Sequence, residues 1–223
     1  MGSDYLEEAV ERARAYAESA YKRGRAPPSH GFDHVERVVS LCRWLSEELS
    51  LSLRERALLE AAAWLHDVAM AIYGTKEGHA ERSAEIAAGV LKDILPSKDL
   101  ETVVSAIREH SWGQGSPPSS RVSAMLQDAD RLDALGAIGL YRVLVYGAFR
   151  GRTLYHPEDP FAERREADDS RYTIDHFFLK LLKLKEYMNT EPAKREAERR
   201  TELLKAFLDE LRRELSLCRS PQA

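Results

Sequence analysis

An imidazole and a carboxylate stand side by side at His66 and Asp67, in the middle of the apolar run 63–69. An ionisable side chain in a buried helix must be hydrogen-bonded, paired or bound to a metal, because its desolvation is otherwise costly. Adjacent side chains on a helix project about 100° apart, so the two groups can flank one ion that lies between their directions. A satisfied polar pair, or a helix edge at the surface, explains the same residues. Further ligands on other helices are needed to decide between these interpretations.

Apolar residues recur at helical spacing through most of the chain, and no strand alternation or internal repeat accompanies them. The spacing predicts an all-α fold with helices or helical stretches at about 4–23, 32–49, 53–72, 79–95, 97–110, 122–149, 173–189 and 192–217. Ser52 and Glu55 resemble a capping box that opens the third helix, and Ser97 is expected to cap the fifth. The segment 151–169 is rich in proline, glycine and charge, which is typical of a lid, a partner surface or a plain connection.

The composition describes one globular domain and excludes several functions. Of 223 residues, 43% are hydrophobic and 31% are charged, and the net charge of −4 provides no basic surface for stable nucleic-acid binding. Cys42 and Cys218 stand far apart, which argues for a reducing compartment and against a thiolate metal site. The N-terminal residues form no signal peptide, membrane span or lipidation signal, so we expect a cytoplasmic protein that binds no membrane.

Side chains that suit a metal ion occur in four separate helical stretches. They are His34, His66 with Asp67, His110, and Asp130. Imidazoles and carboxylates together suit a borderline divalent ion, and helical proteins build such sites between facing helices. Two of these residues also have a plainer explanation. His34 could be a surface or capping histidine, and Asp130 could belong to a solvated acidic face. Apolar residues surround Asp130, which favours an inward carboxylate, with Asp133 three residues later behind it.

These residues carry a resemblance to a known family. The order His34, His66–Asp67, Asp130 resembles the HD-domain superfamily of metal-dependent phosphohydrolases. The segments LQDADRLDALGAIG (126–139) and HFFLKLLKL (176–184) are similar to the YedJ-like subgroup, and the similarity extends from about residue 28 to 216.

The resemblance implies one domain over 1–223, with an HD core at about 28–150 and two long C-terminal helices, at about 170–217, packed on it. It implies metal ligands at His34, His66, Asp67 and Asp130, with His66 and Asp67 as catalytic residues and Asp33 and Asp133 behind the ligands. The expected cofactor is one divalent ion among Mn, Co, Ni, Fe, Zn and Mg. A homodimer is compatible with the family.

The same resemblance implies hydrolysis of a phosphate ester or anhydride of a small phosphorylated molecule, expected to be a nucleotide. Attack by a metal-bound water is the expected mechanism, and some similar proteins release pyrophosphate from nucleoside triphosphates. A cyclic-nucleotide phosphodiesterase, favoured by a second metal ion at His79 and His110, is the first alternative. A non-catalytic nucleotide-sensing module and a purely structural helical protein are the others.

Several further side chains are candidates for binding substrate phosphates. His176, Lys180 and Lys183 follow one another at i, i+4 and i+7, which predicts either a phosphate clamp or a solvated lysine-rich helix face. Arg37 and Lys76 are additional phosphate candidates. His79 and His110 could hold a second metal ion, contact phosphate or cap a helix.

Overall fold

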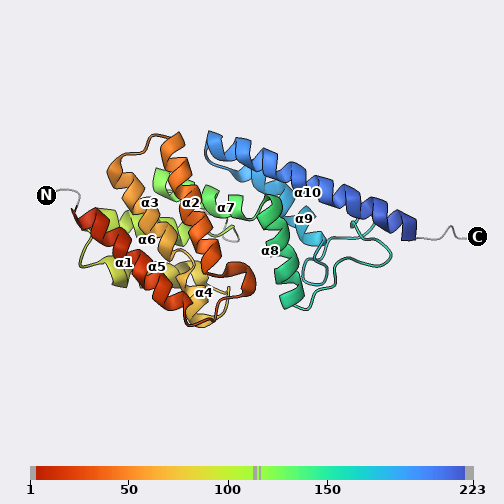
Figure 1. Ribbon diagram of the computed structural model, residues 1–223, viewed down its shortest axis with the longest axis horizontal. Coiled ribbons are helices and arrows are strands. Elements are labelled where there is room, and N and C mark those ends of the chain that lie inside the picture. Colours follow the sequence, from red (N-terminus) through yellow and green to blue (C-terminus); the bar gives the residue numbers. More distant parts are fainter. Residues whose placement is uncertain (1–3, 113–114, 116, 219–223) are drawn as a thin grey trace, which may run out of the picture.

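The computed structural model describes residues 4–112, 115 and 117–218, and it is helical as predicted (Figure 1). The α-helices are α1 (Asp4–Tyr21), α2 (Phe32–Glu48), α3 (Leu53–Leu65), α4 (Val68–Tyr73), α5 (His79–Leu91), α6 (Ser97–Glu109), α7 (Arg121–Asp133), α8 (Gly136–Phe149), α9 (Asp175–Leu179) and α10 (Glu191–Cys218). Two 3₁₀ segments, η1 (Pro28–His30) and η3 (Leu181–Tyr187), accompany the α-helices. Within these described ranges no strand forms, and Thr153 and Tyr172 make an isolated bridge.

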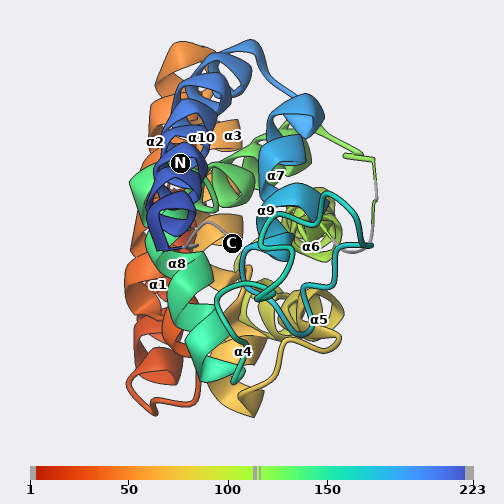
Figure 2. The ribbon, with the colours of Figure 1, turned by 90° about the vertical axis from the view of Figure 1, so that its right-hand side faces the viewer.

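The helices form an N-terminal bundle and a C-terminal layer that meet along α7 and α8. In the bundle, α3 lies centrally and packs on α1, α2, α6 and α7. In the C-terminal layer, the long α10 runs along α8 and η3 (Figure 1). The irregular segment 150–174 winds beside α9 (Figure 2). The irregular structure predicted for 151–169 is confirmed.

The helix predicted over 53–72 is wrong in one respect that matters for the site. α3 ends at Leu65, and His66 and Asp67 form a turn before α4 begins. Asp67 has φ −113° and ψ 12°, and its backbone carbonyl accepts a hydrogen bond from the Tyr21 hydroxyl at 3.1 Å. The two residues therefore reach the site from a turn held by another helix, and not from adjacent positions of one continuous helix.

The long helix predicted over 173–189 is also wrong. The five-residue α9 is followed by Lys180, at φ −132° and ψ −63°, and then by the seven-residue η3. Leu181 and Leu184 are both buried, and their spacing of three suits the three residues per turn of a 3₁₀ helix. One long C-terminal helix, α10, is confirmed, while the other is replaced by these two short segments.

The remaining helix boundaries follow local chemistry. Ser52 and Glu55 form the predicted capping box, with each side chain accepting the other's backbone N–H. The predicted Ser97 cap is wrong, because Pro96 occupies the cap position and Ser97 begins α6. The apolar stretch 122–149 is broken into α7 and α8, which meet at 71°. No single helix among the described residues has the length and apolarity to cross a membrane, and only this bent pair passes that test together.

Candidate metal centre and substrate cavity

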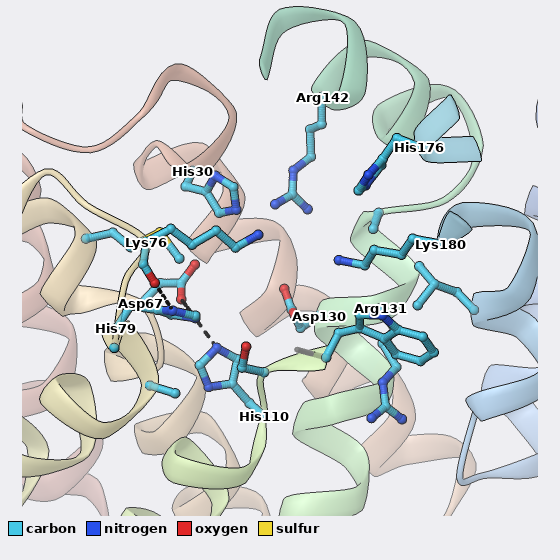
Figure 3. Close-up of a pocket in the computed structure, with 17 residues that line it drawn as sticks. His30, Asp67, Lys76, His79, His110, Asp130, Arg131, Arg142, His176 and Lys180 are labelled. Atoms are coloured by element: carbon cyan, nitrogen blue, oxygen red, sulfur yellow. Dashed lines mark hydrogen bonds and ion pairs between the residues drawn. The ribbon is translucent and has the colours of Figure 1, made fainter. Parts of the chain in front are cut away.

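Four buried imidazoles surround the carboxylate of Asp67. The Nε2 atoms of His34 and His66 lie 3.5 and 3.6 Å from its Oδ2. Those of His79 and His110 lie 3.5 and 3.4 Å from its Oδ1 (Figure 3). The five side chains come from α2, the α3–α4 turn, the first residue of α5 and the end of α6. Ligand atoms from four separate parts of the bundle thus converge on one point.

The opposite ring nitrogens determine which tautomer each imidazole adopts. The Nδ1 atoms of His66, His79 and His110 lie 2.7, 2.8 and 2.6 Å from the backbone carbonyls three residues earlier. A carbonyl oxygen only accepts, so each Nδ1 carries the proton and donates it. In the neutral ring, Nε2 then presents a lone pair to the centre of the cluster, which is the arrangement found in metal-ligating histidines.

The donor set fits divalent metal ions. His34, His66 and Asp67 form one group that could hold an ion, and Asp67, His79 and His110 form a second. Asp130 Oδ1 lies 3.5 Å from His34 Nε2 and can complete the first group. Asp67 Oδ1 is buried without a hydrogen-bond partner in the described chain, and the lone pairs of neutral imidazoles cannot supply one. A buried anionic oxygen facing several lone pairs requires a cation.

The pKa values in the cluster have identifiable causes. Burial raises the pKa of Asp67, but the surrounding imidazoles outweigh burial and bring it well below its ordinary range. Burial lowers the pKa of His66 to about 4, which leaves its Nε2 free of a proton. Burial also lowers the pKa of His34 and His110, yet the nearby carboxylates, Asp133 beside His34 and Asp67 beside His110, raise both overall. A metal ion at this site competes with protons for these two rings.

Asp133 supports the cluster from behind. Its carboxylate accepts hydrogen bonds from His34 Nδ1 at 2.7 Å, Arg37 Nε at 2.7 Å and Arg142 Nη1 at 2.8 Å. These contacts lower the pKa of Asp133 despite its burial. The carboxylate of Asp33 lies outside the histidine cluster, where it is exposed and accepts a hydrogen bond from Arg37 Nη1 at 2.6 Å. Asp133 therefore orients a candidate ligand, whereas Asp33 holds only the arginine.

A cavity of about 390 Å³ opens beside the metal cluster (Figure 3). Asp67, His79, His110 and Asp130 line one side of it. Four cationic side chains also line it, namely Lys76, Arg131, Arg142 and Lys180. Burial, together with Lys76 and Arg142, lowers the pKa of Lys180 to about 7. Its ammonium has no hydrogen-bond or ion-pair partner in the described chain. The cavity thus combines a cation-binding end with positive charge aimed at an anion.

The cavity includes some of the predicted phosphate candidates and not others. Lys76, His176 and Lys180 line it, but Lys183 is exposed and does not. Arg37 lines a different depression, of about 440 Å³, where it is bound to Asp133 and Asp33. The predicted i, i+4, i+7 clamp is therefore wrong at its third member, because the helix breaks at Lys180.

Sequence reasoning missed several residues of the cavity, namely His30, Trp112, Arg131 and Arg142. Arg142 had a usable signal, since it is the single charged residue in the apolar stretch 136–149. A buried arginine in such a stretch must have an anionic partner, and here that partner is Asp133. His30 had no such signal, because it lies in a proline-rich break between helices.

Comparisons with known proteins identify relatives of this chain. The HD-domain family model matches residues 31–135, the range that contains His34, His66, Asp67 and Asp130. An HD-superfamily hydrolase from Bacillus thuringiensis is 30% identical, with a TM-score of 0.71 over 95% of this chain and 98% of that one. A protein from Lactobacillus plantarum is 28% identical, with a TM-score of 0.74 over 95% and 98%.

A third relative is the uncharacterized protein YpgQ from Bacillus subtilis, which is 28% identical over 83% of this chain and 84% of its own. The crystal structure of YpgQ in complex with ADP has a TM-score of 0.69 to this protein, at 25% identity over 94% of this chain and 96% of that one. The 30% identity to the Bacillus thuringiensis hydrolase over nearly the whole length of both chains, together with the HD-domain match, shows that the chain belongs to the HD superfamily of hydrolases, a family of metal-dependent phosphohydrolases.

Proposed function

We propose that this protein hydrolyses a nucleotide, with release of pyrophosphate from a nucleoside triphosphate as the leading reaction. One observation carries the proposal: a single cavity holds candidate metal ligands on one side and the cationic side chains of Lys76, Arg142 and Lys180 on the other. Its volume of about 390 Å³ is in the range of small-molecule sites. A polyphosphate fits such a cavity, because its negative charge can bind a metal ion on one side and the cationic side chains on the other.

The ligands proposed for one ion are His34, His66, Asp67 and Asp130, and the catalytic pair is His66 and Asp67. When bound, a divalent ion lowers the pKa of a water molecule and offsets the charge on a phosphoryl oxygen. The chain's own contribution is orientation, since the hydrogen bonds of each Nδ1 hold the imidazoles with Nε2 toward the centre.

The cationic side chains bind the phosphates. Lys180 lies across the cavity from Asp67, while Lys76 and Arg142 lie between them along its upper side (Figure 3). Arg142 is held in place by Asp133 at 2.8 Å and by the Ser29 carbonyl at 2.9 Å. Fixed donors of this kind stabilise the charge that develops on a phosphoryl group without reorganising during the reaction. ADP in the YpgQ crystal structure supports a nucleotide as the ligand. Membership of the YedJ-like subgroup, which suggests pyrophosphate release, stays a prediction.

The test is a hydrolysis screen on chelated protein resupplied with Mn, Co, Ni, Mg or Zn. Nucleoside triphosphates, monophosphates and cyclic nucleotides are the substrates, and pyrophosphate and phosphate are detected separately. Metal-dependent pyrophosphate release supports the proposal. Orthophosphate from monophosphates makes the protein a nucleotidase. Metal binding without any turnover favours the nucleotide-sensing alternative.

A cyclic-nucleotide phosphodiesterase is the second candidate, because Asp67, His79 and His110 form a second group that could hold an ion. Asp67 would then bridge two ions, which is typical of sites that clamp both oxygens of a phosphodiester. Metal titration of the wild type and of His110→Asn measures this directly. Two ions in the wild type and one in the variant, with cyclic-nucleotide turnover lost, would favour the phosphodiesterase.

A further inference from the structure

The irregular segment 150–174 holds one cavity side chain from behind. His176, on α9, donates from Nδ1 to the carboxylate Oδ2 of Asp169 at 2.6 Å. The ring of His176 lines both the main cavity and an adjoining pocket of about 80 Å³. Val143, Tyr146 and Leu181 contribute apolar surface to that adjoining pocket. His176 thus lies between the main cavity and a pocket that is lined by both cationic and apolar side chains.

The hydrogen bond to Asp169 determines what His176 offers to a ligand. A carboxylate only accepts, so Nδ1 carries the proton of the neutral ring and Nε2 has a lone pair. Burial lowers the pKa of His176 to about 4, with Lys180 adding to the effect and Asp169 opposing it. Nε2 has no hydrogen-bond partner in the described chain. The cavity therefore contains an unused acceptor beside its cationic donors.

This acceptor does not suit a phosphate. Ionised phosphoryl oxygens accept hydrogen bonds and donate none, so they pair with Lys180 and Arg142 but not with a lone pair on nitrogen. The organic part of a nucleotide, in contrast, carries hydroxyl donors on the sugar next to the phosphates. The adjoining pocket has room for part of a sugar next to the phosphate-binding side chains.

We propose that His176 Nε2 accepts a hydrogen bond from a sugar hydroxyl of the nucleotide, and that Asp169 is the positioning residue that sets its tautomer. This inference rests on the proposed function, because it assigns one more contact to the same substrate. It replaces the phosphate-binding role that sequence spacing predicted for His176. It also gives the irregular segment a role, as the scaffold that selects among substrates.

The scaffold is anchored well enough to hold Asp169 in place. Asp175 is fully buried, and it binds Arg165 with both oxygens, at 2.5 and 2.8 Å. It also accepts the backbone N–H of Asp168 at 2.6 Å, directly before Asp169. A Cβ at Gly147 of α8 would collide with Thr173, so the end of the segment lies tightly against α8. These contacts fix the donor–acceptor geometry before substrate binds.

The kinetic test compares a ribonucleoside triphosphate with its 2′-deoxy and 3′-deoxy analogues. Wild type should prefer the substrate with the contacted hydroxyl by about tenfold in kcat/KM, the effect of one hydrogen bond. His176→Ala should reduce that ratio to near one. Asp169→Asn should do the same while keeping the ring, because asparagine can donate to Nδ1 and so stabilise the other tautomer. Asp168→Asn, a neighbouring substitution that leaves the His176 contact intact, should keep the wild-type ratio.

A second measurement does not depend on turnover. The ¹⁵N chemical shifts of the His176 imidazole, assigned by their loss in His176→Gln, report the tautomer at pH 7 with and without ADP. A protonated Nδ1 and an unprotonated Nε2 in wild type, reversed in Asp169→Asn, are expected. A protonated Nε2 in the wild type overturns the inference whatever the activity. If His176→Ala and Asp169→Asn hydrolyse the triphosphates with the wild-type ratio of kcat/KM between the ribonucleotide and its deoxy analogues, the inference is overturned while the proposed function stays intact. Absence of nucleotide turnover, with the expected tautomer and no ADP binding, overturns both.

Discussion

Asp133→Asn is the substitution that best tests how the metal centre is held together. The Asp133 side chain is only 2% exposed, and it accepts hydrogen bonds from His34, Arg37 and Arg142. Asparagine preserves the shape but removes the charge. Arg37 keeps Asp33 as a partner, whereas Arg142 is left with the Ser29 carbonyl alone.

Two separate losses are expected. Removing one partner of a buried ion pair costs about 3–5 kcal/mol, because the other charge stays buried without compensation. Arg37 retains an acidic partner, so we expect a loss of unfolding free energy near the lower end, about 3 kcal/mol. The loosened His34 ring should in addition weaken metal binding about 10–100-fold, which corresponds to about 1.4–2.7 kcal/mol.

The two losses are measured independently. Urea unfolding with chelator present gives the stability of the metal-free protein, and calorimetric titration with Mn, at a temperature where the variant is folded, gives the metal affinity. Asp33→Asn is the matched control, since its carboxylate is 62% exposed and contacts the same arginine. The control should change stability by about 1 kcal/mol or less. Wild-type metal affinity in a folded Asp133→Asn protein would refute the role assigned to this carboxylate.

The remaining predictions concern the ligands, the pH dependence and the packing. His66→Ala and Asp67→Ala should each abolish metal binding and hydrolysis while leaving the circular dichroism helical; wild-type turnover with metal bound would show that the assignment is wrong. Because the pKa of Lys180 falls from 10.5 to about 7, kcat/KM should fall as pH rises through 7, and Lys180→Met should remove that decline. The unfolded chain binds one more proton than the folded chain between these values, so stability should rise over that range, and less steeply in Lys180→Met. Gly147→Ala should destabilise by about 1–3 kcal/mol in thermal unfolding, because its Cβ meets a threonine of the irregular segment. Gly89→Ala, with open space around it in a helix, should stabilise by about 0.5–1 kcal/mol instead.

The helical class and the chemistry of the ligands were predictable from the sequence for local reasons. Apolar spacing reports which face of a helix is buried, and the Ser52–Glu55 box marks a helix start within four residues. The apolar residues on both sides of His66 and Asp67 favoured the burial that the structure shows, although the sequence left a helix edge at the surface as an alternative. None of these inferences requires knowledge of a distant contact.

The geometry of the site was decided by tertiary structure. Spacing along a helix could not reveal that the chain turns at Asp67, because the hydrogen bond from Tyr21 comes from α1. Nor could it choose between a capping and a ligand role for His79 and His110. In the structure, Nδ1 of each ring bonds a backbone carbonyl near a helix terminus while Nε2 faces Asp67, so the two roles are compatible in one ring.

The same division explains why residues of the cavity were missed or misplaced. Arg142 reaches the cavity only because α7 and α8 meet at 71°, and His176 acquires its tautomer from Asp169, on a segment with no periodic pattern. Helix formation depends on short-range periodicity that a sequence displays directly. Hydrogen bonds between residues far apart in the chain depend on how the helices pack, and that packing is a property of the whole fold.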